Sequence, residues 1–201
     1  MRRIGSRAPI VTLSIVLSGV VLASGCGQQP TQPGAESHDH VTTSGTNQLP
    51  QEALVTLDVV QNHFPEMARQ NTPTENPDAA GTPEATRMAI YEGDGGRKVT
   101  ISADRYPSSD SASTAFEQAI DKSEAVQGFV ALPAPVDIGD RAFAGIVSQG
   151  DDTHIGYGAL TGEFVVGVTS AGYPATTENT AKLIDLTRAA VERAEAAQGH
   201  S

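Results

Sequence analysis

Three strand-like segments, separated by very short links, constrain the fold of this chain more than any other feature of its sequence. They cover residues 141–148, 154–160 and 163–169. The link Thr161-Gly162 is short enough for a tight hairpin, and the link Gly150-Asp151-Asp152 consists of residues that favour turns. Because such short links join antiparallel strands, we expect the three segments to lie side by side in an antiparallel sheet.

Two more strands and three helices are predicted from the spacing of apolar residues. Strands at 88–92 and 97–106 flank the turn Gly93-Asp94-Gly95-Gly96, and a polar, proline-rich loop at 70–86 precedes them. Helical spacing joins Leu57, Val60, Phe64 and Met67, with Thr56 as the cap and a break at Pro65. The same spacing joins Ala112, Ala115, Phe116, Ala119 and Ile120 after Ser109 or Asp110, and it joins Ile184, Thr187, Val191 and Ala194, with Leu183 and Ala190 beside them, in a helix over 177–197.

These elements define an α+β fold class. We expect a single antiparallel sheet of about five strands packed with two or three helices, in the order α-β-β-α-β-β-β-α, with the helices on one face or at the ends of the sheet. Residues 51–198 form the globular domain. The chain has one cysteine in total, so the domain must fold without an internal disulfide.

The N-terminal segment has the features of an export signal. Three arginines lie in the first seven residues, and residues 8–24 carry no charge. A spanning helix, the competing interpretation, needs roughly 20 apolar residues, and this run is shorter and is interrupted by Ser and Gly. We expect residues 1–25 to be a lipoprotein signal peptide that is removed.

The only cysteine, Cys26, directly follows this segment. The small residues Ala23-Ser24-Gly25 before it resemble the lipobox of bacterial lipoproteins, although that family prefers Leu at the position that Ala23 holds. The resemblance implies a diacylglyceryl group on the Cys26 sulfur, with palmitate-like chains, and two chains are about what stable anchoring takes. We therefore expect attachment to the cell membrane or the outer membrane, facing the extracytoplasmic side, rather than a free thiol or an intermolecular disulfide at Cys26.

Residues 26–50 are predicted to be the lipidated N-terminus and a disordered tether. The stretch is rich in Gln, Pro, Gly, Ser and Thr and holds almost no large apolar residue. Within it, His38-Asp39-His40 is a candidate metal clip, but a floppy chain supplies no preorganised third and fourth ligand. We expect no metal and no cofactor, and metal handling by His38 and His40 stays an alternative.

Charge and aromatic content limit the partners. With 13 Lys+Arg against 24 Asp+Glu, the net charge is −11, and so acidic a chain repels phosphate backbones, so we expect no nucleic-acid partner. Trp is absent and aromatic residues make up only 4% of the chain. This composition disfavours a sugar-stacking platform or an aromatic-rich protein interface.

Few residues have the pattern of a catalytic site. Asp151, Asp152 and His154 cluster in one turn, and Asp137, Asp140 and Arg141 lie in the loop before the third strand. If these loops converge, an acid/base group could be assembled. Aspartates at turns usually bond their own backbone, so we assign no catalytic residue. His63 and Asp94 are interpreted as surface residues of the first helix and of the glycine-rich turn.

Three stretches carry a resemblance to small exported bacterial lipoproteins of actinobacterial type: RYPSSDSASTAF, VDIGDRAFAG and GEFVVGVTSAG. Similar patterns occur in extracellular sensor domains of some bacterial Ser/Thr kinases and in PsbP-like envelope proteins. The resemblance implies a non-enzymatic envelope module and transfers no functional residue.

We therefore expect a lipid-anchored, non-catalytic envelope lipoprotein whose domain binds a partner protein or a small ligand. One alternative is a carrier of an apolar ligand in a cavity between sheet and helix. Gly156, Gly158 and Gly167 favour it because a strand glycine lets its own helix or a ligand approach closely. The other alternative is a hydrolase that uses the Asp/His cluster.

Overall fold

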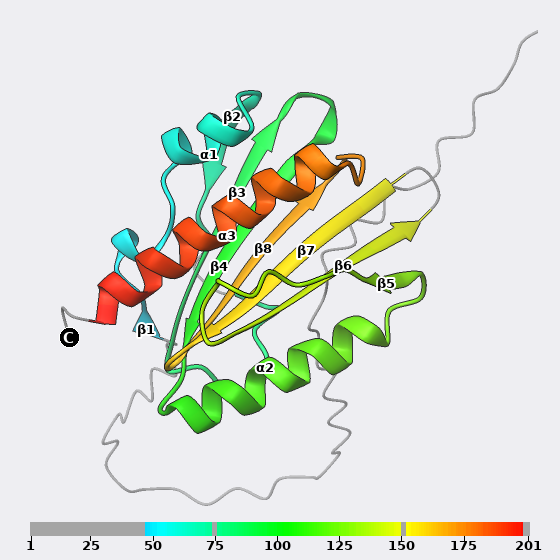
Figure 1. Ribbon diagram of the computed structural model, residues 1–201. Helices are drawn as coiled ribbons and strands as arrows, with labels where there is room; N and C mark the ends of the chain where they lie inside the picture. Colours follow the sequence, from blue (N-terminus) through cyan, green and yellow to red (C-terminus); the bar gives the residue numbers. More distant parts are fainter. Residues whose placement is uncertain (1–46, 74–75, 150–151, 199–201) are drawn as a thin grey trace, which may run out of the picture.

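The computed structural model describes residues 47–73, 76–149 and 152–198 (Figure 1). The elements follow in the order β1 (Asn47–Gln48), η1 (Gln51–Ala53), α1 (Leu57–His63), β2 (Met67–Asn71), β3 (Ala85–Gly93), η2 (Asp94–Gly96), β4 (Lys98–Arg105), α2 (Ser109–Glu124), β5 (Phe129–Ala131), β6 (Arg141–Gln149), β7 (Asp152–Thr161), β8 (Phe164–Ala171) and α3 (Thr177–Gln198). The α+β class is confirmed.

All eight of these strands belong to one sheet. Its order is β1-β3-β4-β8-β7-β6-β5, with β2 also paired to β3. The three segments joined by short links form the antiparallel run β6-β7-β8, as predicted. The pairing of β1 with β3 is parallel, so the sheet is not antiparallel throughout.

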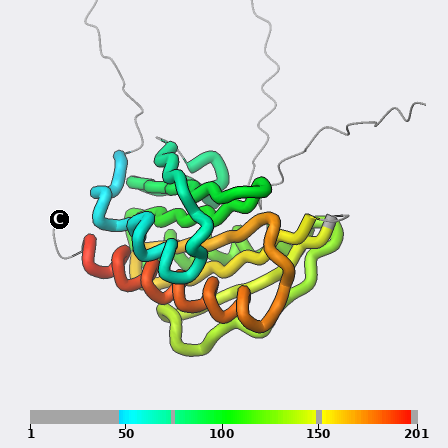
Figure 2. Tube along the Cα trace, turned by 90° about the horizontal axis from the view of Figure 1, so that it is seen from above, coloured from blue at the N-terminus to red at the C-terminus, as the bar shows by residue number. Residues whose placement is uncertain are grey.

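The helices cover both faces of the sheet, which corrects the expectation of one face. Successive side chains of β8 point to opposite faces of the sheet, so they show which helix covers each face. Phe164, Val166 and Val168 are fully buried in one cluster with Leu183 and Leu186 of α3. Val165 packs with the second cluster, which contains the α2 residues. Figure 2 shows α3 extending along the sheet.

The expected number of five strands and the expected element order are wrong, because three short strands are added. The strands β1, β2 and β5 have 2, 5 and 3 residues. Met67 begins β2 instead of continuing the first helix, because α1 ends at His63, two residues before Pro65. Residues 70–71, predicted as loop, belong to β2.

Two caps and one helix face also differ from the prediction. The side chain of Ser108, not of Ser109 or Asp110, accepts a hydrogen bond from the backbone N–H of Ser111 at the start of α2. Thr56 holds the cap position of α1, but its hydroxyl donates to Asp58 and caps no backbone group. On α3, Leu186 is fully buried, whereas Ile184 is only half-buried.

The packed chain begins before residue 51. Asn47 and Gln48 pair with β3, and the Leu49 side chain is 2% exposed within the core of the α3 face. The Leu49 carbonyl also accepts a hydrogen bond from the Arg87 guanidinium. Residues 47–50, which the sequence assigns to the tether, therefore pack with the domain.

Candidate ligand-binding pocket

A pocket of about 660 Å³ lies between the sheet and α2, on the face opposite α3. Its floor comes from β3, β4, β8, β7 and β6, and one wall comes from α2. Pro73 and the segment 76–80 form another wall. We call it the sheet–α2 pocket. The side chains that face it are Asp78, Met88, Ile90, Lys98, Thr100, Ser102, Asp104, Phe116, Ala119, Ile120, Ser123, Phe129, Phe143, His154, Val165, Thr169 and Ala171, among others.

The pocket exists because α2 packs closely over only part of its length. In its first half, Ala112, Ala115 and Phe116 are at most 2% exposed and pack with Tyr106. Farther along the same stripe, Ala119 and Ile120 are only half-buried and line the pocket. The second half of α2 is therefore packed less tightly against the sheet than the first half, and it forms a wall of the pocket.

Three glycines on β7 and β8, which have no side chains, enlarge the space above the sheet. Cross-strand register places Gly158 opposite Gly167, and Gly156 opposite Thr169. A Cβ atom built on Gly158 would lie 3.6 Å from Cε2 of Phe116, so the Phe116 ring lies over that glycine. Of the two approaches that the sequence left open, the structure shows that of the domain's own helix at Gly158, while Gly156 and Gly167 line the pocket.

A buried carboxylate lies at one end of the floor. Asp104 is 4% exposed, and its Oδ1 and Oδ2 accept hydrogen bonds of 3.1 and 2.9 Å from Nδ2 of Asn76. The Thr86 hydroxyl donates to the same carboxylate. Burial raises the pKa of Asp104 to about 6, with a smaller increase from the charge of Asp78, while the bonds from Thr86 and Asn76 oppose the rise. Burial also raises the pKa of Asp78.

Basic side chains lie at the other end of the floor. Lys98 and Asp104 are six residues apart on β4, which is about 20 Å along a strand. Lys98 pairs with Glu92 at 3.6 Å. Burial lowers the pKa of His154, and the charge of Asp152 opposes that shift. Polar groups therefore stand at both ends of a mostly apolar pocket.

The structure does not bring the two acid/base groups of the hydrolase hypothesis together. His154 pairs with Val147, and Arg141 pairs with Leu160 at the other end of the same hairpin. Six residues of β6 separate those two pairs, which is about 20 Å. Asp152 is exposed, and Asp151 lies outside the described residues.

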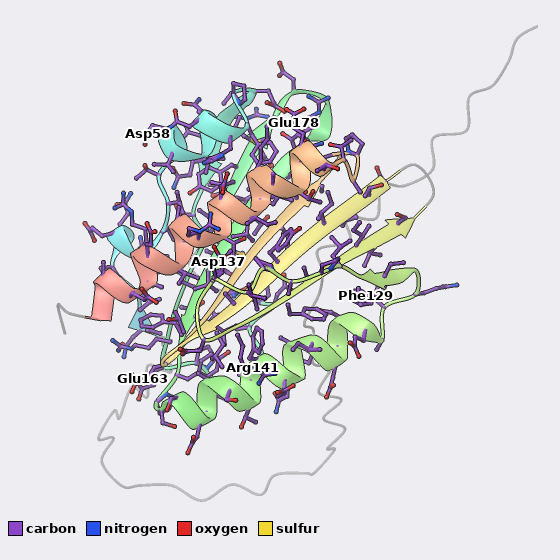
Figure 3. The ribbon with its side chains drawn as sticks, viewed as in Figure 1. Asp58, Phe129, Asp137, Arg141, Glu163 and Glu178 are labelled. Carbon is purple, nitrogen blue, oxygen red and sulfur yellow. The ribbon has the colours of Figure 1, made fainter. Side chains whose placement is uncertain are left out.

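The second group has structural partners instead. Asp137 accepts a 3.0 Å bond from Arg188 of α3, and Asp140 accepts a 2.8 Å bond from the backbone N–H of Gly162. Arg141 pairs with Glu117 on α2 and lies 5.3 Å from the centre of the Phe116 ring. Figure 3 labels Asp137 and Arg141 in these places.

The remaining candidates lie away from the pocket or cannot be placed. His63 is the last residue of α1, and Asp94 is exposed in η2. Cys26, His38, Asp39 and His40 lie outside the described residues. Within the described part of the chain, no group of three or more His, Cys, Asp or Glu side chains could hold a metal ion. Nor does any helix among those residues have the length and apolar character needed to cross a membrane.

The sequence did not reveal Phe129, Phe143 and Gly145 as pocket residues. Phe129 lies on a strand that was not predicted, and the alternation of apolar residues on β6 does not indicate which face meets a cavity. The only available signal was the close spacing of Phe143 and Gly145 on one face of a predicted strand.

No family model matches the chain, and no curated protein matches it. Among solved structures, the extracellular domain of PknH from Mycobacterium tuberculosis matches with a TM-score of 0.47 and 13% identity, over 72% of this chain and 100% of that chain. A GTP-binding regulator from Thermotoga maritima matches with a TM-score of 0.37 and 11% identity, over 72% of this chain and 96% of that chain.

Proposed function

We propose that this protein is a non-catalytic binding module that holds a small apolar ligand in the sheet–α2 pocket. The observation that carries the proposal is the pocket itself, because its volume of about 660 Å³ lies within the roughly 300–1,000 Å³ of small-molecule sites. Of the two occupants expected from the sequence, a partner protein or a small ligand, a pocket of this size favours the small ligand.

The character of the lining supports an apolar ligand. Met88, Ile90, Ile120, Phe116 and Phe143 surround the glycine floor. Each methylene group that a ligand moves from water into such a site contributes about 0.8 kcal/mol. The charged side chains stand at the ends, where they favour a polar group of the ligand only at its extremities.

The proposal also includes the place of the module. A diacylglyceryl group on Cys26 would hold it at a membrane, on the extracytoplasmic side, and the charge pattern of residues 1–25 together with the position of the lone cysteine supports this. Mass spectrometry of the protein made in a bacterium that processes lipoproteins tests it. We expect a cleaved, acylated N-terminus in the wild type and none in Cys26→Ala. An unmodified thiol on an intact leader would overturn the anchor.

Binding is tested with N-phenyl-1-naphthylamine, an uncharged probe that fluoresces in apolar sites. We expect saturable fluorescence with the wild type and its loss in Gly156→Val, whose added isopropyl group occupies the floor of the pocket. Gly156 has no positive φ, so a β-branched residue suits its strand conformation.

The matched control is Ser148→Val, which adds the same side chain at an exposed position of β6. Urea unfolding of both variants shows whether they are folded. Equal fluorescence from the wild type and a folded Gly156→Val variant would refute the pocket as the binding site.

A further inference from the structure

We propose that Phe129 is a specificity-determining residue, because its ring closes the sheet–α2 pocket on the β5 side and limits the length of the ligand. This inference rests on the proposed function. The strand β5 ends the strand order of the sheet and pairs with β6. The position of Phe129 on β5, just after α2, is labelled in Figure 3.

The Phe129 ring occupies the space that a side chain at position 145 would fill, because residue 145 is glycine. Phe129 is the cross-strand partner of Val147, and its ring extends along β6 to Gly145, two residues from that partner. Diagonal neighbours of this kind lie within reach of an aromatic side chain. A Cβ atom on Gly145 would lie 2.0 Å from Cε2 and 2.4 Å from Cζ of Phe129. No other residue type at position 145 would therefore leave the ring where it is.

The ring of Phe143 packs against the ring of Phe129. Phe143 lies next on the same face of β6, and its ring stacks with that of Phe129 at 5.7 Å between centroids and an angle of 11°. Both side chains line the pocket. Stacking stabilises such a pair of rings beyond the area that they bury, so the two rings form one wall.

This wall depends little on the core of the domain. Phe129 is half-buried, Val130 is 61% exposed and Ala131 is exposed. Removing the Phe129 ring therefore opens the pocket towards the edge of the sheet, where β5 is the last strand. We expect a ligand chain too long for the native pocket to extend through that opening.

The experiment measures the affinity of straight-chain alcohols, from 1-octanol to 1-hexadecanol, by displacement of N-phenyl-1-naphthylamine. The alcohols are uncharged, so the carboxylates of the pocket do not bias the series. In the wild type we expect affinity to rise about fourfold per methylene, the equivalent of about 0.8 kcal/mol, and to stop rising once the chain reaches Phe129. In Phe129→Ala the fourfold steps continue to longer alcohols.

Two further variants and one control make the result specific. Gly145→Ala keeps the ring but displaces it from its seat, and Phe129→Leu shortens it. Both should extend the series in the same direction as Phe129→Ala, which covers the case that Phe129→Ala fails to fold. The control Val130→Ala changes the neighbouring exposed side chain and should leave the series as in the wild type.

The outcomes separate this inference from the proposed function. If the probe and the alcohols do not bind the wild type, the proposed function fails and the role of Phe129 fails with it. If they bind the wild type and the series ends at the same alcohol in folded Phe129→Ala, Phe129→Leu and Gly145→Ala, only the role of Phe129 is overturned. An equal extension by Val130→Ala also overturns it, because general loosening of β5 then explains the change.

Discussion

The substitution Asp104→Asn should change how the stability of the domain depends on pH. The Asp104 carboxyl is buried, and its pKa is about 6 in the folded chain against 3.8 for an ordinary aspartate. The folded state therefore binds the proton more tightly than the unfolded state. The contribution of Asp104 to the free energy of unfolding therefore increases as the pH falls from above 6 towards 3.8. At neutral pH the carboxyl is ionised, and this contribution is lost.

The size of the effect follows from the two pKa values. Their full difference corresponds to about 3 kcal/mol, at about 1.36 kcal/mol for each unit. Between pH 7.5 and pH 4.5 the part that is expressed is about 2 kcal/mol. His154 acts in the opposite direction, because burial lowers its pKa and its protonation at acid pH favours the unfolded state. Only a difference between two variants isolates Asp104.

Urea unfolding of the wild type and of Asp104→Asn, at a series of pH values across this range, supplies that difference. Asparagine is uncharged throughout and keeps an oxygen that accepts from Thr86 and Asn76. The free energy of unfolding of Asp104→Asn minus that of the wild type should fall by about 2 kcal/mol from pH 7.5 to pH 4.5. Parallel pH profiles would refute the claim that burial raises the Asp104 pKa.

Substitutions at three further positions test the packing around the pocket and the core by urea unfolding. Phe116→Ala should lower the free energy of unfolding by about 3–5 kcal/mol, because Phe116 is 1% exposed beneath α2; a loss below about 1 kcal/mol would contradict that packing. Ser108→Ala should cost about 1 kcal/mol through loss of the cap to the Ser111 N–H, whereas Ser108→Gly should cost only a few tenths; equal costs would argue against a cap. Tyr91→Phe should cost about 1–3 kcal/mol, because the buried Val55 carbonyl loses the Tyr91 hydroxyl that donates to it; an unchanged midpoint would show that the bond contributes nothing.

The elements that the sequence predicted well carry their own periodicity. Strands β6, β7 and β8 alternate and are separated by turn residues, and α2 and α3 have apolar stripes that need no partner to be recognised. The missed strands have no such signal. In β2, Met67 is buried and the next four residues are exposed. Its strand conformation comes from pairing with β3, which is information that the local sequence does not contain.

The pocket was foreseen only in outline, for a related reason. The glycines on β7 and β8 indicated a surface that something approaches closely. The apolar spacing along α2 is uniform from Ala112 to Ile120. Its first part is buried against the sheet, whereas its last part lines the pocket. Which part is sealed depends on the distance between α2 and the sheet. That distance depends on the contact of Phe116 with Gly158, two residues that lie far apart in the chain.

The two faces of the sheet differ in their roles: the α3 face holds the larger hydrophobic core, and the opposite face holds the pocket. The α3 face is filled by large, fully buried side chains from β8, β4 and α3. On the opposite face, the pocket floor includes Gly156, Gly167, Ser102 and Thr169, which bury little apolar surface and so contribute little to the free energy of folding. It also holds Asp104, whose ionisation at neutral pH opposes folding. A chain selected for stability alone would fill this face with larger apolar residues. Because the α3 face stabilises the fold, substitutions on the open part of the pocket floor should change binding more than stability, and the Gly156→Val measurement depends on this separation.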